Sequence, residues 1–295
     1  MPTGLLYLIV VLIWGSSWIG IAYQAGPVPA LVSIGYRFLL SSALLMLFCT
    51  VSGRPLRFSL RDHGWMLLQG LSLFCLNYLM FYWSAKDLTS GLLAIIFSIM
   101  SVMNLANGAI FFGQRIDRRV AIGAVFGLAG LSCVFWPEIA KADASSATLT
   151  GLGLSLFGTY CASIGNLVSV KLKTRNIPVI QSNAIGMGYG ALAALIISAV
   201  AGSTFAVDTR PSYLISLFLL ALFASVIGFS CYLTLVQRIG AGRAAYSAVL
   251  FPVVALTIST ILEGYRWTGL AVLGIVLVLC GNLIVLRRPA VTIRR

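Results

Sequence analysis

The sequence predicts an all-α integral membrane protein with ten transmembrane helices, arranged as a 5+5 inverted repeat with both termini in the cytoplasm. Three observations favour this fold class. The 295 residues are 60% hydrophobic and only 9% charged, with a mean hydropathy of +1.01, whereas soluble domains carry about a quarter charged residues. Long apolar runs recur along the whole chain, and basic residues gather in alternate loops between them. A water-soluble protein is thereby excluded.

The spans follow from apolar runs of about 20 residues, the helix length that crosses the ~30 Å hydrocarbon core. Each must be helical, because lipid offers no water to satisfy backbone N–H and C=O groups. The first run is too long for the apolar region of a signal peptide and lacks a basic start and a cleavage site. The expected spans are residues 4–23, 30–51, 64–85, 89–112, 119–136, 150–170, 180–201, 212–236, 243–262 and 267–286.

The distribution of lysine and arginine sets the predicted orientation. With the N-terminus inside, the inner loops carry 15 of the 20 basic residues and the outer loops carry 4. Arg37 is the remaining one and lies inside the second span. Cytoplasmic loops are enriched in Lys and Arg, so this alternation supports both the orientation and the count of ten. The net charge of +13 therefore indicates membrane orientation, and no nucleic acid partner is expected.

A weak internal repeat at an offset of 151 residues divides the chain. The matching residues are Gly91, Ala94, Gly113, Arg115, Gly123, Leu128 and Gly130 in the first half, and Gly242, Ala245, Gly264, Arg266, Gly274, Leu279 and Gly281 in the second. We expect a five-helix repeat over 1–136, a periplasmic linker over 137–149, a second repeat over 150–288 and a basic cytoplasmic tail over 289–295. Since five is odd, the second copy must be inverted. Inverted repeats are typical of secondary transporters, which bind substrate near the midplane between the copies.

Several functional classes are disfavoured by residues that the sequence lacks. There is one histidine, His63, and the six cysteines lie unpaired in apolar runs, so neither a metal site nor another cofactor is expected. No phosphate-binding loop occurs, which excludes ATP-driven transport by this chain alone. An intramembrane enzyme would need a catalytic acid, base or nucleophile in mid-membrane, and no His, Asp, Glu or Lys lies inside the expected spans. A channel would usually show rings of charge or a carbonyl filter shared by subunits. Both classes are therefore disfavoured.

Arg37 is the charged side chain placed well inside a span, and an ionisable group there is a functional hypothesis by default. It is suited to attract an anionic group such as a substrate carboxylate. The alternative is structural: Arg37 extends to the outer interface or pairs with Glu263. Because none of the seven acidic residues lies in mid-span, we expect facilitated transport or exchange rather than strong coupling to protons or sodium, although Glu263 leaves coupling open.

Polar and aromatic stripes at helical spacing supply further candidates for a substrate cavity. They also fit hydrogen bonds and packing between helices, so both interpretations stay open. The residues are Trp14 and Ser17 in span 1, Asn77, Tyr78 and Phe81 in span 3, Phe97, Ser101 and Asn104 in span 4, and Asn166 in span 6.

The chain resembles the drug/metabolite transporter superfamily, in its EamA-type ten-span branch. The resemblance covers both halves and rests on Trp14-Gly15-Ser16-Ser17-Trp18, Tyr36-Arg37-Phe38, the segment 94–104, Ala244-Ala245-Tyr246 with Pro252, and Gly274 and Gly281. It implies export of small metabolites, commonly amino acids or related compounds, across the bacterial inner membrane. The family's cavity, carried over by position, implies Tyr78, Phe81, Ser98, Met100 and Tyr160 as substrate-binding residues, and we add Tyr246 of the matching motif.

One departure from the family pattern bears on the substrate. In its aromatic amino acid exporters the span 4 cavity positions are aromatic and a proline follows, whereas this chain has Ser98 and Met100, followed by Ser101. A bulky aromatic substrate is therefore less favoured. The expected function is export of amino acids or amino-acid-like compounds by alternating access; drugs, quaternary amines and nucleoside-like metabolites are the alternatives. The expected partners are a small-molecule substrate and the lipid bilayer. A monomer is compatible with this function, and the oligomeric state stays open.

Overall fold

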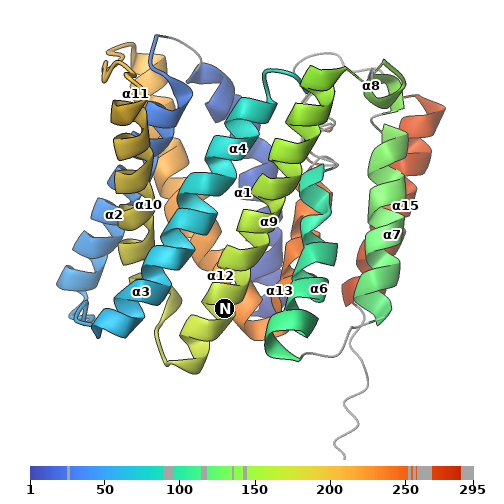
Figure 1. Cartoon of the computed structure of the whole chain (residues 1–295). Helices are drawn as coiled ribbons and strands as arrows, with labels where there is room; N and C mark the ends of the chain where they lie inside the picture. Colours follow the sequence, from blue (N-terminus) through green and yellow to red (C-terminus); the bar gives the residue numbers. More distant parts are fainter. Residues whose placement is uncertain are drawn as a thin grey trace, which may run out of the picture.

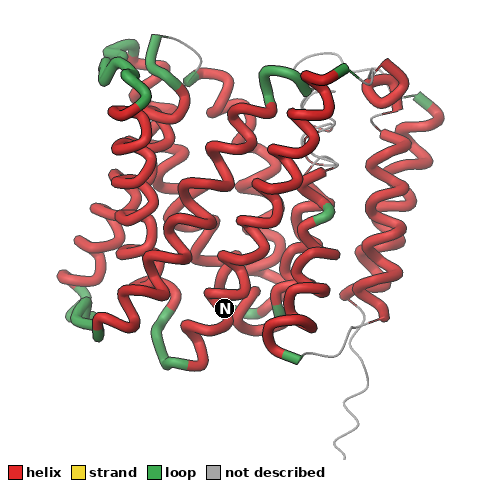
Figure 2. Tube along the Cα trace, viewed as in Figure 1, coloured by secondary structure: helices red, strands yellow, loops and turns green. Residues whose placement is uncertain are grey.

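The structure is a computed structural model that describes residues 1–24, 27–88, 93, 96–113, 118–134, 136–141, 145–251, 254, 257 and 268–286. In this part of the chain every regular element is a helix, and the helices pack side by side as a bundle (Figures 1 and 2). The first half contains α1 (Thr3–Tyr23), α2 (Ala30–Val51), α3 (Leu60–Gln69), π-helical η1 (Gly70–Leu76), α4 (Asn77–Ser84), α6 (Met100–Phe112), α7 (Arg118–Val134) and α8 (Trp136–Lys141).

The second half contains α9 (Ser146–Thr174), α10 (Val179–Val200), α11 (Pro211–Leu219), π-helical η2 (Leu220–Phe229), α12 (Ser230–Ile239), α13 (Ala241–Ala245), the 3₁₀-helix η3 (Tyr246–Leu250) and α15 (Gly269–Leu286). The sequence-based expectation of an all-helical membrane protein is confirmed. Five continuous helices are long and apolar enough to cross a bilayer: Ala30–Val51, Leu60–Ser84, Ser146–Thr174, Val179–Val200 and Pro211–Ile239. Shorter apolar helices cover Thr3–Ser17, Ile96–Phe112 and Gly269–Val285.

Most expected spans agree with these helices to within a few residues, and two details differ. The fifth helix ends at Val134, and the short helix α8 follows from Trp136. The segment 137–149, expected as a polar linker, is therefore partly helical, since it contains most of α8 and the first turn of α9. Glu263 and nine of the 20 residues of the expected span 243–262, Pro252 among them, lie outside the described residues.

Helix boundaries follow ordinary capping chemistry. Ser59 and Ser145 cap α3 and α9, and each Oγ accepts a backbone N–H from the third residue along, which satisfies a donor that the first turn leaves free. At the start of α11, the Arg210 side chain and backbone N–H donate to the Asp208 carboxylate at 2.8 and 2.9 Å. These bonds hold the pKa of Asp208 below its ordinary value.

The two halves share their irregularities at the offset of 151 residues. Helices α3 and α11 begin at the equivalent residues Leu60 and Pro211. The π-helical segment Gly70–Leu76 maps onto 221–227, within η2. Because π-helical segments are rare, their recurrence at equivalent positions shows that the repeat extends to the backbone.

Helices α7 and α15, which are repeat equivalents, contact each other through four glycines. A Cβ at Gly130 would lie 2.5 Å from the Gly274 carbonyl oxygen, and one at Gly274 would lie 2.5 Å from that of Gly130. Gly123 and Gly281 form a second such pair, at 3.0 and 2.8 Å. Crossed pairs mean that the two helices run antiparallel, as in a contact between copies related by a two-fold axis. Small residues allow this approach of the backbones.

The described loops that we expect on the inner side lie at one end of the bundle, the end near the N-terminus in Figure 1. Arg238 donates to the Met1 carbonyl oxygen at 2.7 Å, Lys173 donates to the Gln237 carbonyl oxygen, and Arg175 pairs with Asp62. We call this the basic end. Loops that are far apart in sequence therefore share one face of the bundle.

The close contact between α7 and α15 predicts that Gly130→Ala and Gly274→Ala destabilise the protein by about 1–3 kcal/mol each, because the new methyl group meets backbone that cannot move aside. The thermal midpoint of the detergent-solubilised protein measures this effect. Gly153→Ala on α9 is the control, since a Cβ there meets no atom within 4 Å. Equal midpoints for all three variants would contradict the contact.

Candidate functional site

A cluster of aromatic rings occupies the middle of the bundle. Trp14 of α1 lies 4.8 Å from Phe229 between ring centroids, Phe229 lies 4.9 Å from Phe74, and Phe74 lies 5.2 Å from Phe38. The edge-to-face and tilted arrangements are those that aromatic pairs favour. We call this set the central aromatic cluster; its members are Trp14, Phe38, Phe74, Tyr78, Phe229, Tyr232 and Phe251.

Trp14 joins the first helix to the eighth expected span. Its indole Nε1 donates to the Ala224 carbonyl oxygen at 2.8 Å. Gly228 makes room for the ring, since a Cβ at that position would lie 2.6 Å from Nε1. The π-helical stretch η2 thus supplies both an acceptor and a gap for Trp14.

Arg37 lies buried beside this cluster, with 5% of its surface exposed. Its Nε donates to Ser225 Oγ at 2.8 Å, and its guanidinium carbon lies 5.4 and 5.8 Å from the ring centroids of Phe38 and Tyr78. No carboxylate pairs with Arg37 among the residues that the structure describes. Burial contradicts the alternative in which Arg37 extends to the interface; the alternative partner, Glu263, lies outside the described residues.

The amide side chains among the predicted site residues form hydrogen bonds between helices, which is one of the two interpretations left open by the sequence; the other is a substrate cavity. Asn77 Nδ2 donates to the Gly158 carbonyl oxygen at 2.9 Å, and Asn104 Nδ2 donates to that of Ala241 at 3.1 Å. Asn166 Nδ2 donates to the Tyr232 hydroxyl oxygen at 2.9 Å and contacts Met100 Sδ at 3.4 Å. The Oδ1 atoms of Asn104 and Asn166 are buried without a partner, so these two side chains keep unmet hydrogen-bonding capacity.

The remaining span 4 candidates adjoin the cluster. Phe97 packs edge-to-face on Phe81, with centroids 5.5 Å apart. Ser98, Met100 and Ser101 are buried, and Ser101 Oγ donates to the Ser98 carbonyl oxygen at 3.0 Å. The structure therefore places these side chains on the inner face of the bundle, and their role in substrate binding stays a prediction.

Two predicted site residues lie elsewhere. Tyr160 is 38% exposed and follows the exposed Leu156 and Phe157 by one helical turn, so it lies on the outer apolar face of α9. Tyr246 is fully buried in another cluster, where its hydroxyl donates to the Gly123 carbonyl oxygen and its ring packs on Gly127 and Gly281. Tyr246 therefore belongs to the α7–α15 contact rather than to the central aromatic cluster.

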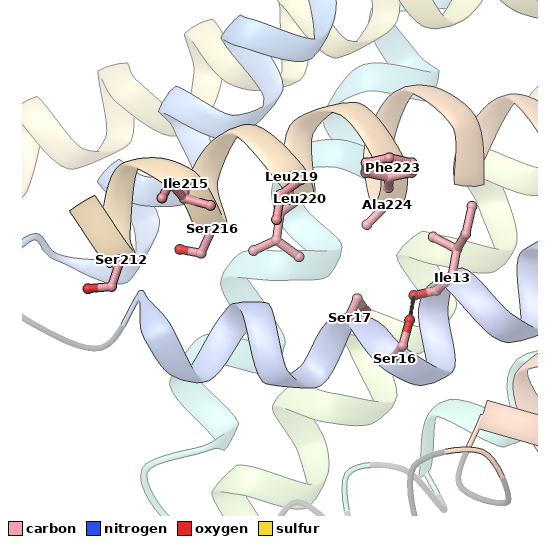
Figure 3. A pocket seen from close by; sticks show the side chains of 10 residues that line it. All are labelled: Ile13, Ser16, Ser17, Ser212, Ile215, Ser216, Leu219, Leu220, Phe223 and Ala224. Atoms are coloured by element: carbon pink, nitrogen blue, oxygen red, sulfur yellow. Dashed lines mark hydrogen bonds between the residues drawn. The ribbon is translucent and has the colours of Figure 1, made fainter. Parts of the chain in front are cut away.

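A cleft of about 720 Å³ opens between α1 and the α11–η2 segment (Figure 3). Ser17 is the predicted site residue on its wall, where Ser17 Oγ donates to the Trp14 carbonyl oxygen at 2.9 Å. The wall of the cleft is mainly apolar with four serines, and it is lined by Ile13, Ser16, Ser17, Ser212, Ile215, Ser216, Leu219, Leu220, Phe223 and Ala224.

Sequence reasoning missed Ser225, Phe229, Tyr232 and Phe251. The repeat contains the signal that would have found three of them: at an offset of 151, Tyr78 maps to Phe229, Phe81 to Tyr232 and Met100 to Phe251. Equivalent positions of two copies related by a two-fold axis line the same central space.

Comparisons with known proteins agree with this architecture. The profile of the EamA-like transporter family matches residues 1–136 and 149–287. A protein of Escherichia coli strain K12 named "Probable amino-acid metabolite efflux pump" is 26% identical over 291 residues, covering 94% of this chain and 92% of its own. The "Uncharacterized inner membrane transporter YedA" of the same strain is 26% identical over 289 residues, covering 95% and 91%.

An "Uncharacterized transporter in trpA 3'region" of Buchnera aphidicola subsp. Schlechtendalia chinensis is 27% identical over 263 residues, covering 89% of this chain and 84% of its own. A solved crystal structure superimposes with a TM-score of 0.80 over 96% of this chain and 95% of that chain, at 14% identity. This likeness shows a shared fold.

The placement of the two tyrosines predicts distinct effects of removing their hydroxyl groups. Tyr246→Phe should lower the free energy of unfolding by about 0.5–1.5 kcal/mol, because the hydrogen bond to Gly123 is lost, and should leave the KM for transported solutes unchanged. Tyr160→Phe should change neither quantity. Thermal midpoints and counterflow in proteoliposomes provide the measurements; a changed KM in Tyr246→Phe would return this residue to the substrate site.

Proposed function

The chain belongs to the EamA-like transporter family, and from this premise we propose that it exports small metabolites, above all amino acids or amino-acid-like compounds, by alternating access around the central aromatic cluster. It is a multi-pass protein of the bacterial inner membrane. The name of the 26% identical "Probable amino-acid metabolite efflux pump" supports the direction and the substrate class.

The proposed topology is ten spans with both termini in the cytoplasm. The antiparallel contact of the equivalent helices α7 and α15 supports an inverted repeat, and the shared basic end supports an inner N-terminus. Two inverted copies can exchange conformations about a site at their interface, which exposes it to each side in turn.

Arg37 is the observation that carries the substrate assignment. A buried guanidinium without a carboxylate partner among the described residues is a costly feature in a membrane protein, and a substrate carboxylate would provide the missing partner in bidentate geometry. The neighbouring rings of Phe38 and Tyr78 offer apolar surface to the rest of the molecule. We therefore assign all the predicted site residues except Tyr160 and Tyr246 to the substrate-binding region. These residues are Trp14, Ser17, Arg37, Asn77, Tyr78, Phe81, Phe97, Ser98, Met100, Ser101, Asn104 and Asn166.

Arg37 also separates the proposed substrates from the alternatives. Aromatic rings attract quaternary ammonium groups, but a fixed positive charge beside the rings repels them. Nucleoside-like metabolites carry no carboxylate for the guanidinium to bind. Transport of either class would then be weaker than transport of an amino acid.

Counterflow in proteoliposomes tests the function directly. Liposomes are preloaded with neutral, aromatic or charged amino acids, nucleosides or quaternary amines, and uptake of the labelled compound is followed. Saturable exchange of amino acids is the expected result, and bulky aromatic ones should exchange more weakly. Absence of exchange for every amino acid, with protein that elutes as a single folded species, would contradict the assignment; non-saturating flux would indicate a channel.

Arg37→Gln should raise the KM for carboxylated substrates about 10- to 100-fold, since hydrogen bonds to a charged group contribute about 1.5–3 kcal/mol. The KM of Arg37→Lys should lie between those of Arg37→Gln and the parent protein, because lysine keeps the charge and loses the bidentate geometry. Solutes without a carboxylate serve as internal controls. If exchange of all solutes falls together with the yield of folded protein, Arg37 is structural.

A further inference from the structure

Buried polar side chains without hydrogen-bond partners gather in one part of the molecule. Among the described residues, seven contain such atoms, and six of these seven lie in the half of the bundle next to the basic end: Gln69, Asn104, Asn166, Gln181, Asn183 and Ser230. Gln69 and Asn183 stand out because both polar atoms of each side chain are unpartnered and neither residue is exposed.

The positions of these residues along their helices establish the location. Gln181 and Asn183 lie in the first turns of α10, which follows Arg175 of the basic end. Gln69 is in α3, the helix that contains Asp62; its Oε1 lies 3.4 Å from where a Cβ of Gly186 would be. Asn183 precedes Gly186 by three residues and shares its face of α10. Both amides therefore lie along the contact between α3 and α10.

The rest of the set lies close by in the same half. Asn166 bonds to Tyr232 of α12, and Asn104 bonds to Ala241, just beyond the end of that helix. Native proteins leave few buried polar groups unsatisfied, and each one calls for a physical explanation. Five amides in one closed region indicate that these groups meet water or substrate in a second conformation.

At the end of the bundle opposite the basic end, the equivalent cleft is open rather than closed. The cleft between α1 and η2 is open there. At the offset of 151, Ile13 and Ala224 of that cleft map to Ile164 and Leu73, which belong to the contact between α9 and η1. That contact is closed: Ser16 and Phe223 of the open cleft are exposed, whereas their equivalents Leu167 and Ser72 are buried. One of two equivalent clefts is open and its counterpart is closed.

Polar contacts at the basic end hold the closed cleft together. Arg175 of α9 forms an ion pair with Asp62 of α3, and the same carboxylate accepts a hydrogen bond from Ser59 Oγ at 2.6 Å. Both partners are partly shielded from solvent, with side-chain exposures of 26% and 15%. Lys173 ties α9 to the Gln237 carbonyl oxygen near the end of α12.

We infer that the closed half of the bundle is the cytoplasmic access route of a polar or zwitterionic substrate, lined by the amides of Gln69, Asn104, Asn166 and Asn183 and latched by the Arg175–Asp62 ion pair. The inference rests on the proposed function, since it takes the central aromatic cluster as the destination of the route. When α3 separates from α9 and α10, the four amides gain water and then substrate as partners. When the latch closes, they lose these partners again.

Cysteine accessibility tests the route independently of the substrate. In a variant without the six native cysteines that elutes as the parent does, Asn183→Cys is labelled with a membrane-impermeant maleimide in vesicles of both orientations. Ala184→Cys is the matched control, since it lies at the same depth and is fully buried, with its carbonyl oxygen facing Ser42 of α2. We expect slow labelling of Asn183→Cys from the face that carries the N-terminus, and none of Ala184→Cys.

Opening the latch should accelerate this labelling. Asp62→Asn and, separately, Arg175→Gln should each raise the rate at Asn183→Cys about two- to fivefold, the range expected for a partly exposed ion pair. The exchanged pair Asp62→Arg with Arg175→Asp should restore the slow rate. Labelling rates are compared only for variants whose detergent-solubilised protein elutes from a sizing column as the parent protein does. If one of the two single variants does not fold, the other still tests the latch.

Two outcomes would overturn the inference: equal labelling of Asn183→Cys and Ala184→Cys, or labelling that neither latch variant changes. The amides would then be structural groups that bind fixed water. Latch-dependent labelling together with failed counterflow of the whole panel would sustain the route and reject the proposed substrates. Labelling from the opposite face would reject the cytoplasmic location.

Discussion

The structure depends on one constraint: within the bilayer, a polar group must find its partner inside the protein. Helices satisfy the backbone, and bonds such as Asn77 to Gly158 and Ser33 to Tyr213 satisfy side chains while joining helices. The places where this satisfaction fails are therefore informative. Arg37 lacks a carboxylate partner among the described residues, and five of the six described side chains with unpartnered amide atoms lie in the half of the bundle next to the basic end.

A symmetric scaffold holds asymmetric chemistry. Several features follow the repeat: the two π-helical stretches, the glycine contacts between α7 and α15, and the aromatic rings at the equivalent positions Tyr78 and Phe229. The positive charge of Arg37 in α2 does not follow the repeat, because α10, the counterpart of α2, carries no charged residue. Trp14 likewise corresponds to Gly165. The second half therefore folds without an arginine or a tryptophan at the equivalent positions.

Sequence reasoning worked where the signal is local. The expected span 30–51 coincides with α2 (Ala30–Val51), and the stripe of Phe97, Ser101 and Asn104 lies on the inner face of the bundle. It failed for Tyr160 and Tyr246. A tyrosine satisfies the same composition rules on a lipid-facing surface, in a helix contact or in a binding site, so its role depends on the rotation of its helix and on the neighbour that it meets.

The sequence by itself determined the membrane class, the approximate spans, the repeat and the uneven distribution of charge, because hydropathy, periodicity and loop charge are properties of short segments. Only the tertiary structure decided that Arg37 lies buried against Phe38 and Tyr78, that Ser225 and Phe229 complete its surroundings, and that one of two equivalent clefts is open. These features depend on contacts between different helices, 188 residues apart for Arg37 and Ser225 and 210 residues apart for Trp14 and Ala224, and such contacts are set by how the helices tilt, rotate and pack.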